Sequence, residues 1–246
     1  MNFQQDTVSI NGIDCSVLSA GSGTPLLFFH GAGTTSGFEA LLPWAQHHRV
    51  LVPFHPGWSG SQDDPTMTSL HDYVMHYLEF IDQLCLDQVD LVGLSMGGQL
   101  AARFASEHRR RVRKLVLVAP AGLDAPGYPL LDFSKIPPED TLSYLTENVP
   151  LILQRSKGAP DPCEAQCFVR VLPSLMDRKF TRWLHRLTMP SMLVWGEKDR
   201  TTPIQQADEW LRYAPSLQFV RVPNGGHLVL DEQPQMVEAI GKFLID

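Results

Sequence analysis

The serine in the stretch Gly93-Leu94-Ser95-Met96-Gly97 is the first candidate for chemistry. An apolar segment precedes it and a segment of small residues follows, which is the pattern of a strand, a sharp turn and a helix. Such a turn strains the serine backbone, and glycines at positions 93 and 97 avoid collisions with neighbouring backbone. A helix beginning near Met96 would direct its free N–H groups and its positive dipole end towards the serine. The motif predicts a nucleophile, but it is short enough to need support from the rest of the chain.

Asp199 and His227 are the residues that could activate Ser95. Each follows an apolar segment that predicts a strand, 191–195 and 217–222 respectively. In an open sheet of parallel strands, ligands bind at the edge where the strands end. His227 could take the serine proton during attack on a carbonyl and later return it to the leaving group. The three residues together predict acyl transfer through a covalent acyl-serine.

The carboxylate partner of His227 has two competing candidates. Glu197 lies two residues before Asp199, and Asp124 follows the preceding predicted strand. Any of these carboxylates could hold the imidazole in the required tautomer and stabilise its charged form. We favour Asp199 because it lies a short loop beyond its strand.

Strand-like and helix-like segments alternate along the chain. Apolar residues recur at helical spacing over 69–85, which predicts an amphipathic helix. Asn11-Gly12 is a strong two-residue turn between two strand-like segments and predicts an antiparallel hairpin at the sheet edge. The alternation predicts an α/β fold with a mostly parallel, eight-stranded sheet flanked by helices. The expected strands are 7–10, 15–18, 25–29, 50–54, 89–94, 114–119, 191–195 and 217–222, and further helices are expected after 95, up to about 213 and over 234–244.

The alternation stops between residues 123 and 187, where prolines cluster and short helices are expected instead of strands. Asp161-Pro162-Cys163-Glu164 is a good helix start, with an N-cap aspartate and a proline at the first position. We predict a small helical cap over 123–187, inserted into a core domain formed by 1–122 and 188–246. Trp183, Phe168 and Leu172 could line a substrate pocket, although packing between cap helices explains them equally well.

From end to end, the chain resembles the α/β-hydrolase family, including the order serine, aspartate, histidine. Within this family it is similar to small capped esterases, enol-lactonases and hydrolases of carbon–carbon bonds. The motifs that carry the resemblance are Gly93-Leu94-Ser95-Met96-Gly97-Gly98, His30-Gly31, Pro56-Gly57, Gly196-Glu197-Lys198-Asp199 and Gly225-Gly226-His227.

The resemblance implies two backbone donors for the negative charge that develops on the substrate carbonyl oxygen. These are the N–H groups of Met96 and Ala32, each worth roughly 3–4 kcal/mol in the transition state. It also implies that His30 and Gly31 shape the supporting loop and that His30 is not the base. The family pattern has an aspartate shortly before the Pro-Gly turn, where this chain has Phe54 and His55. We expect only a structural consequence, with a pocket-lining His55 as the alternative.

Composition and charge exclude several other classes of protein. The chain has 246 residues, 43% of them hydrophobic and 19% charged, which suits one globular domain with a substantial core. A net charge of −7 provides no basic surface for nucleic acid, and no Lys/Arg-rich block predicts a membrane surface. The first residues lack the regions of a signal peptide, and no apolar segment approaches the ~18 residues of a membrane span. We expect a cytoplasmic monomer or homodimer.

The cysteines predict neither disulfides nor a metal centre. Cys15, Cys85, Cys163 and Cys167 are few and scattered, so reduced thiols are expected. Cys163 and Cys167 are spaced i, i+4 on a predicted helix, with His185 as the nearest following histidine. No second ligand pair at zinc-like spacing accompanies them. Water can serve as acyl acceptor, so we expect no metal or organic cofactor.

The leading hypothesis is hydrolysis of a carboxylic ester with a small or medium acyl chain, with water as the second reactant. A second hypothesis is cleavage of a carbon–carbon bond in a dienoic or β-diketone substrate, or opening of an enol-lactone, by the same three residues. Leu94 occupies the position where many dienoate hydrolases carry asparagine, which disfavours this hypothesis. A third hypothesis is a ligand receptor that keeps the three residues but turns over too slowly to act as a catalyst.

Overall fold

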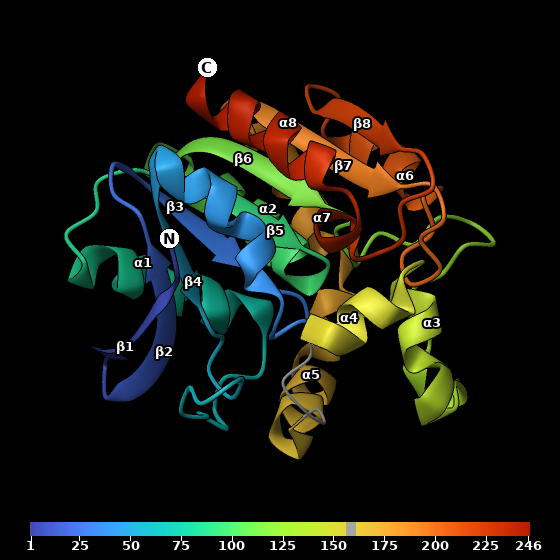
Figure 1. Ribbon diagram of the computed structural model, residues 1–246, viewed down its shortest axis with the longest axis horizontal. Helices are drawn as coiled ribbons and strands as arrows, with labels where there is room; N and C mark the ends of the chain where they lie inside the picture. The colour runs from blue at the N-terminus through green and yellow to red at the C-terminus, as the bar shows by residue number, and fades with distance from the viewer. Residues whose placement is uncertain (156–160) are drawn as a thin grey trace.

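The computed structural model describes residues 1–155 and 161–246 and contains one eight-stranded sheet (Figure 1). The strand order is β1-β2-β4-β3-β5-β6-β7-β8. β2 pairs antiparallel with β1 and β4, and the later pairings are parallel, which confirms the predicted sheet. The strands are β1 (Gln4–Ile10), β2 (Ile13–Ala20), β3 (Thr24–Phe29), β4 (His48–Pro53), β5 (Val89–Leu94), β6 (Val112–Val118), β7 (Ser191–Gly196) and β8 (Gln218–Val222).

The two-residue Asn11-Gly12 turn forms the hairpin at the sheet edge, as the sequence predicts. Asn11 and Gly12 both have positive φ, 50° and 85°, as a two-residue turn requires. The turn pairs Ile10 directly with Ile13 and fixes the register of β1 and β2.

Helices cover both faces of the sheet, and the central strands contribute side chains alternately to each face. Leu27 and Phe29 of β3 join the core beneath α1 (Leu70–Gln83), α2 (Met96–Glu107) and α6 (Gln206–Tyr213). Leu26 and Phe28 join a second core beneath the 3₁₀ helix η1 (Phe38–Gln46), α7 (Val229–Glu232) and α8 (Pro234–Ile245). Strands buried on both faces explain the continuous apolar runs of the sequence.

Helix α1 begins with a capping box, in which the Ser69 hydroxyl accepts from the Asp72 N–H and the Asp72 carboxylate accepts from the Ser69 N–H. This matches the predicted start at 69.

Among the described residues, no helix is both long and apolar enough to cross a membrane.

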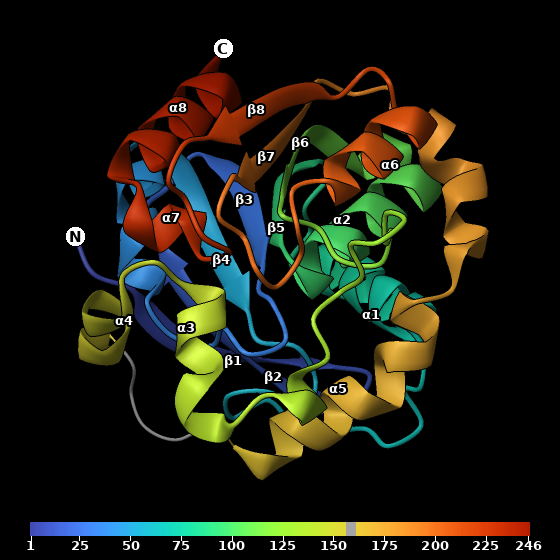
Figure 2. The ribbon, with the colours of Figure 1, turned by 90° about the vertical axis from the view of Figure 1, so that its right-hand side faces the viewer.

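Residues 123–187, termed the inserted segment, connect β6 to β7. Its described elements are η3 (Phe133–Lys135), η4 (Pro138–Asp140), α3 (Thr141–Leu145), α4 (Val149–Arg155), α5 (Pro162–Leu175) and η5 (Arg178–Arg186). Helices α3, α4 and α5 lie beyond the edge at which the parallel strands end (Figures 1 and 2). As predicted, α5 starts at Pro162 with Asp161 as N-cap, accepting from the Cys163 N–H. η5 packs instead against α2 in the helical layer beside the sheet.

Candidate active site

Ser95 lies at the sharp turn between β5 and α2. Its φ of 58° and ψ of −121° place it in a region that non-glycine residues rarely adopt. Three backbone hydrogen bonds hold it there: its N–H donates to Val118 O at 2.9 Å, and its carbonyl accepts from Ala121 and Gln99 N–H, both at 3.1 Å. Ser95 is only 9% exposed, and α2 begins at the next residue. The serine is therefore fixed at the N-terminus of a helix, at the edge where β5 ends.

The two glycines of the motif are required by close backbone approach. A Cβ on Gly97 would lie 2.1 Å from Phe29 O, and a Cβ on Gly93 would lie 2.2 Å from Gly97 O. Neither distance is compatible with a side chain, so the sharp turn needs glycine at both positions.

The structure brings Asp199, in the loop after β7, together with His227, in the loop after β8. Asp199 Oδ2 lies 2.8 Å from His227 Nδ1, and both side chains are almost completely buried. A carboxylate can only accept a hydrogen bond, so the neutral ring of His227 carries its proton on Nδ1 and has its lone pair on Nε2. That tautomer is the one a general base needs. In the part of the chain that the structure describes, no hydrogen bond joins His227 to Ser95.

Thr202 is a partner of this pair that the sequence analysis did not identify. Its hydroxyl donates to Asp199 Oδ2 at 2.8 Å and lies 3.1 Å from His227 Nδ1. The backbone N–H groups of Thr201 and Thr202 both donate to Asp199 Oδ1 at 2.8 Å. With these contacts the buried carboxylate is fully hydrogen-bonded and fixed in orientation. The spacing Asp199-x-x-Thr202, typical of a side-chain-capped turn, was the available signal.

The two competing carboxylates lie elsewhere. Glu197 is exposed to solvent, and only its backbone N–H takes part in the loop, donating to Val222 O. Asp124 Oδ1 accepts from the Leu130 N–H at 2.8 Å and so stabilises a turn of the inserted segment. Among these candidates, Asp199 is the one that contacts His227.

The loop after β3 passes directly beside Ser95. A Cβ on Gly31 would lie 3.2 Å from Ser95 Cβ and 2.9 Å from Thr34 Oγ1, so a side chain here would crowd both residues. The Gly31 N–H donates to Thr34 Oγ1 at 2.8 Å, and Ala32 O accepts from the Trp58 indole at 2.9 Å. These bonds orient the loop that carries the Ala32 N–H.

His30 and His55 form a buried, uncharged pair behind this loop. His30 Nε2 accepts from the His55 N–H at 3.0 Å, so its proton is on Nδ1, 2.8 Å from Gly31 O. His55 Nε2 in turn lies 2.9 Å from His30 O, and its Nδ1 contacts the Tyr77 hydroxyl. Burial lowers the pKa of His30 to about 4 and holds the pKa of His55 well below its usual range. The ring nitrogens of both histidines thus form hydrogen bonds within the protein, and these bonds stabilise the loop after β3.

Met96 and Ala32 flank Ser95 from two elements. Met96 is the first residue of α2, where N–H groups have no partner within the helix. In the described part of the chain, neither the Met96 N–H nor the Ala32 N–H donates to another protein group. Two free donors beside a serine can stabilise an oxyanion formed there.

Glu232, at the end of α7, joins the His227 loop to the inserted segment. Its carboxylate accepts from Gly226 N–H at 2.7 Å, Thr146 Oγ at 2.6 Å and Glu147 N–H at 2.9 Å. The residue before His227 is thereby tied to the end of α3. This role of Glu232 could not be found from sequence, because two of its three partners, Thr146 and Glu147, lie about 85 positions earlier in the chain.

The three residues suggested for a pocket occupy other places. Trp183 is 49% exposed and lies with Ser106 and Glu107 at the C-terminal end of α2, opposite the end that carries Ser95. Phe168 and Leu172 pack, partly buried, against the core that contains α1 and α2. Of the two roles left open for Trp183, a pocket and packing between cap helices, the structure supports neither, because η5 packs beside the sheet and not over its edge.

Comparison with known proteins identifies the family. A family model described as the alpha/beta hydrolase family matches residues 26–240. The structure also resembles that of a serine hydrolase involved in carbazole degradation (the CarC enzyme), with a TM-score of 0.80, 23% identity and 99% of each chain covered. The chain belongs to the alpha/beta hydrolase family, as its motifs and sheet predicted.

Two curated relatives indicate the range of chemistry among similar proteins. A 2-hydroxy-6-oxo-2,4-heptadienoate hydrolase of Pseudomonas putida is 34% identical over 124 residues, covering 47% of this chain and 44% of the relative. The match therefore spans less than half of that enzyme. A pimeloyl-[acyl-carrier protein] methyl ester esterase of Legionella pneumophila is 25% identical over 223 residues, covering 85% of this chain and 89% of the relative.

Proposed function

We propose that this chain is a serine hydrolase that cleaves carboxylic esters of small to medium acyl chain. Ser95 is the nucleophile, His227 the general base and Asp199 the residue that orients His227. The observation that carries the proposal is the hydrogen bond between Asp199 and His227 Nδ1, which leaves the His227 Nε2 lone pair available at the edge that carries the strained Ser95.

In the proposed reaction, Ser95 Oγ attacks the ester carbonyl while His227 Nε2 takes the hydroxyl proton. The N–H groups of Ala32 and Met96 stabilise the resulting oxyanion. His227 then protonates the leaving alcohol, and an acyl-Ser95 remains. Water, deprotonated by the same histidine, releases the acid and restores the serine. Among the described residues no hydrogen bond joins Ser95 to His227. This is compatible with the scheme, since catalytic hydrogen bonds often form or tighten only when substrate binds.

The test is hydrolysis of p-nitrophenyl esters from acetate to laurate by the parent chain and by Ser95→Ala. A fluorophosphonate probe is run in parallel, with mass spectrometry to locate the label. We expect turnover and labelling of Ser95 in the parent and neither in the variant, at unchanged melting temperature. Ser106, buried near the C-terminal end of α2, provides the matched control, because Ser106→Ala should retain both signals. Ester hydrolysis that survives in Ser95→Ala would overturn the proposal.

Carbon–carbon bond hydrolysis is the second candidate, because the Pseudomonas putida relative is named for a dienoate substrate. Leu94 is buried beside Ser95 and provides no polar side chain there. Labelling of Ser95 without turnover of any ester in the series would favour this candidate. Spectrophotometric decay of a 2-hydroxy-6-oxo-dienoate, lost in Ser95→Ala, would then establish it.

A further inference from the structure

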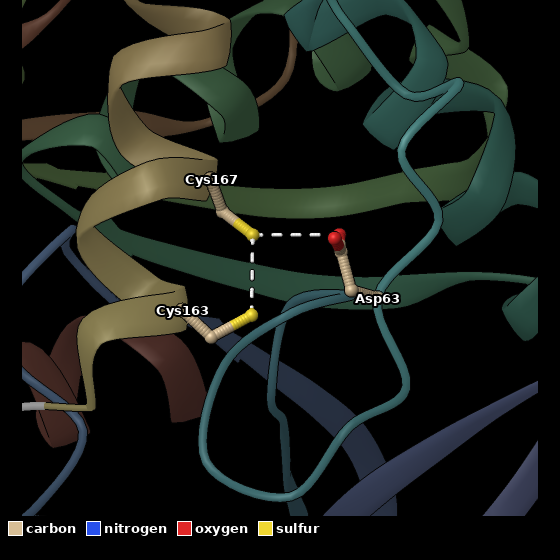
Figure 3. Close-up of side chains that lie close together, drawn as sticks. All are labelled: Asp63, Cys163 and Cys167. Carbon is tan, nitrogen blue, oxygen red and sulfur yellow. Dashed lines mark hydrogen bonds between the residues drawn. The ribbon is translucent and has the colours of Figure 1, made fainter.

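A cluster of two thiols and one carboxylate lies outside the candidate active site. Cys163 and Cys167 lie one turn apart on the same face of α5, and Asp63 belongs to the loop between β4 and α1 (Figure 3). The two sulfur atoms are 4.0 Å apart, and Cys167 Sγ lies 3.4 Å from Asp63 Oδ1. The three potential ligand atoms all lie within 4.8 Å of one another. Figure 3 shows the side chains converging from opposite sides on one point.

Two of these separations match those of ligands around a single tetrahedral ion. With Zn–S bonds of about 2.3 Å at the tetrahedral angle, two thiolate sulfurs lie about 3.8 Å apart. A thiolate sulfur and a carboxylate oxygen bound to the same zinc lie about 3.6 Å apart. Both values are within a few tenths of an ångström of the observed distances of 4.0 Å and 3.4 Å. Two of the three ligand pairs therefore already have the separation that one ion requires, and the third, Cys163 Sγ with Asp63, lies within 4.8 Å.

Arg170, one turn further along α5, balances the charge of the cluster. Its guanidinium donates to both oxygens of Asp63 and also to Cys167 Sγ at 3.4 Å. Without a metal, the carboxylate and guanidinium charges cancel. When a divalent cation replaces both thiol protons, the cluster is again neutral.

We propose that Asp63, Cys163 and Cys167 bind one thiophilic divalent cation of the Zn²⁺ class, with a fourth position open to water. Arg170 stays as an outer hydrogen-bond donor to the Cys167 sulfur and the Asp63 carboxylate. The ion links α5 to the loop that leads from β4 to α1, which α5 already contacts through Glu164 and the Ser59 N–H at 3.1 Å. The site thus fastens the inserted segment to the sheet domain and takes no part in the proposed ester chemistry.

No metal centre was expected from the sequence, because Cys163 and Cys167 have no second ligand pair at zinc-like spacing. The third ligand comes from a loop a hundred residues earlier, and spacing along the chain could not reveal it. A thiol–thiol–carboxylate set with one open position is also unlike the closed Cys-rich sites for which sequence patterns are known.

The test uses the full chain, freed of metal with a chelator and titrated with Cd²⁺, whose bond to thiolate gives an ultraviolet charge-transfer band. We expect saturation at one equivalent and release of two protons, with affinity falling as the pH is lowered because both thiols must ionise. Competition with Zn²⁺ should remove the band.

Cys163→Ser and Asp63→Asn should each weaken Cd²⁺ binding by more than about a hundredfold, since loss of an outer-shell partner alone costs roughly ten- to a hundredfold. Cys85→Ser is the matched control, because Cys85 is an exposed thiol at the end of α1 and should bind as the parent does. Cd²⁺ should raise the melting temperature of the parent and of Cys85→Ser only. Equal binding by Cys163→Ser, or a band lost in Cys85→Ser, would overturn the site. Ester turnover is expected in the metal-free parent, so its failure would count against the proposed function and not against this site.

Discussion

Replacing Asp199 with asparagine should leave His227 in the wrong tautomer. The backbone N–H groups of Thr201 and Thr202 both donate to the Oδ1 position at 2.8 Å. An amide nitrogen cannot accept these bonds, so the variant must place its carbonyl oxygen there and direct its NH₂ group at His227 Nδ1. The ring then accepts at Nδ1 and carries its proton on Nε2. A protonated Nε2 cannot remove the Ser95 proton.

The expected loss of activity is large and the expected loss of stability is small. In serine hydrolases with this arrangement, the wrong tautomer lowers kcat by about 10⁴, which is about 5 kcal/mol at 1.36 kcal/mol per decade. Asp199 accepts four hydrogen bonds, and the variant keeps the two at Oδ1. The NH₂ group can donate to the Thr202 hydroxyl, so no buried polar atom is stranded. The free energy of unfolding should change by no more than about 1–2 kcal/mol.

The assay is steady-state hydrolysis of the best p-nitrophenyl ester, with urea unfolding of the same preparations. Glu197→Gln is the matched control, because it removes an exposed carboxylate from the same loop and should retain full activity. Asp199→Asn that folds normally and retains more than about a hundredth of the parent kcat would refute the tautomer reasoning. An equal loss in Glu197→Gln would show that the loop tolerates no substitution and that Asp199 has no special role.

Two further predictions concern stability. Gly97→Ala places a Cβ 2.1 Å from Phe29 O and should lower the free energy of unfolding by about 3 kcal/mol or more. Gly33→Ala is the control and should leave the free energy of unfolding unchanged, because a Cβ there meets nothing within 4 Å. Equal urea midpoints for the two variants would contradict the close approach of Gly97 to Phe29 O. Burial lowers the pKa of His76 from 6.5 to about 4. Between pH 6.5 and pH 4 the unfolded chain therefore binds more protons at this residue than the folded chain does. The free energy of unfolding falls as the pH drops through that range. Between about pH 7 and pH 5 the His76 contribution amounts to about 2 kcal/mol, and urea unfolding of His76→Leu should show a pH dependence shallower by that amount.

Most of the fold could be predicted because its signals are local. The Asn11-Gly12 turn needs only two residues with positive φ, and Ser69 with Asp72 caps α1 without help from distant residues. The helix η1 was not predicted, because it contains Pro43 and is held by contacts far along the chain. Its Trp44 indole donates to Val237 O of α8 at 2.7 Å, across 193 positions. No periodicity within η1 encodes that partner.

In the candidate site, too, the residues with local sequence signals could be predicted and the others could not. Ser95 could be located because the turn that holds it requires glycines at fixed positions, and the strand ends that carry Asp199 and His227 follow from the predicted sheet. The contacts that Thr202 and Glu232 make depend on the direction of their side chains, which the sequence does not reveal. The place of Trp183 could not be decided from sequence, because helical spacing does not tell which neighbour a short helix meets.

The carboxylate of Glu232 limits how the inserted segment can diversify. It accepts from residues of that segment with one oxygen and from the Gly226 N–H, next to His227, with the other. The Leu228 N–H also donates to Leu145 O at 3.0 Å. Helices grafted from another family member onto this sheet would therefore need a hydroxyl and a free N–H at the positions of Thr146 and Glu147. An exchange of the inserted segment must therefore preserve this junction between the end of α3 and the loop that carries His227.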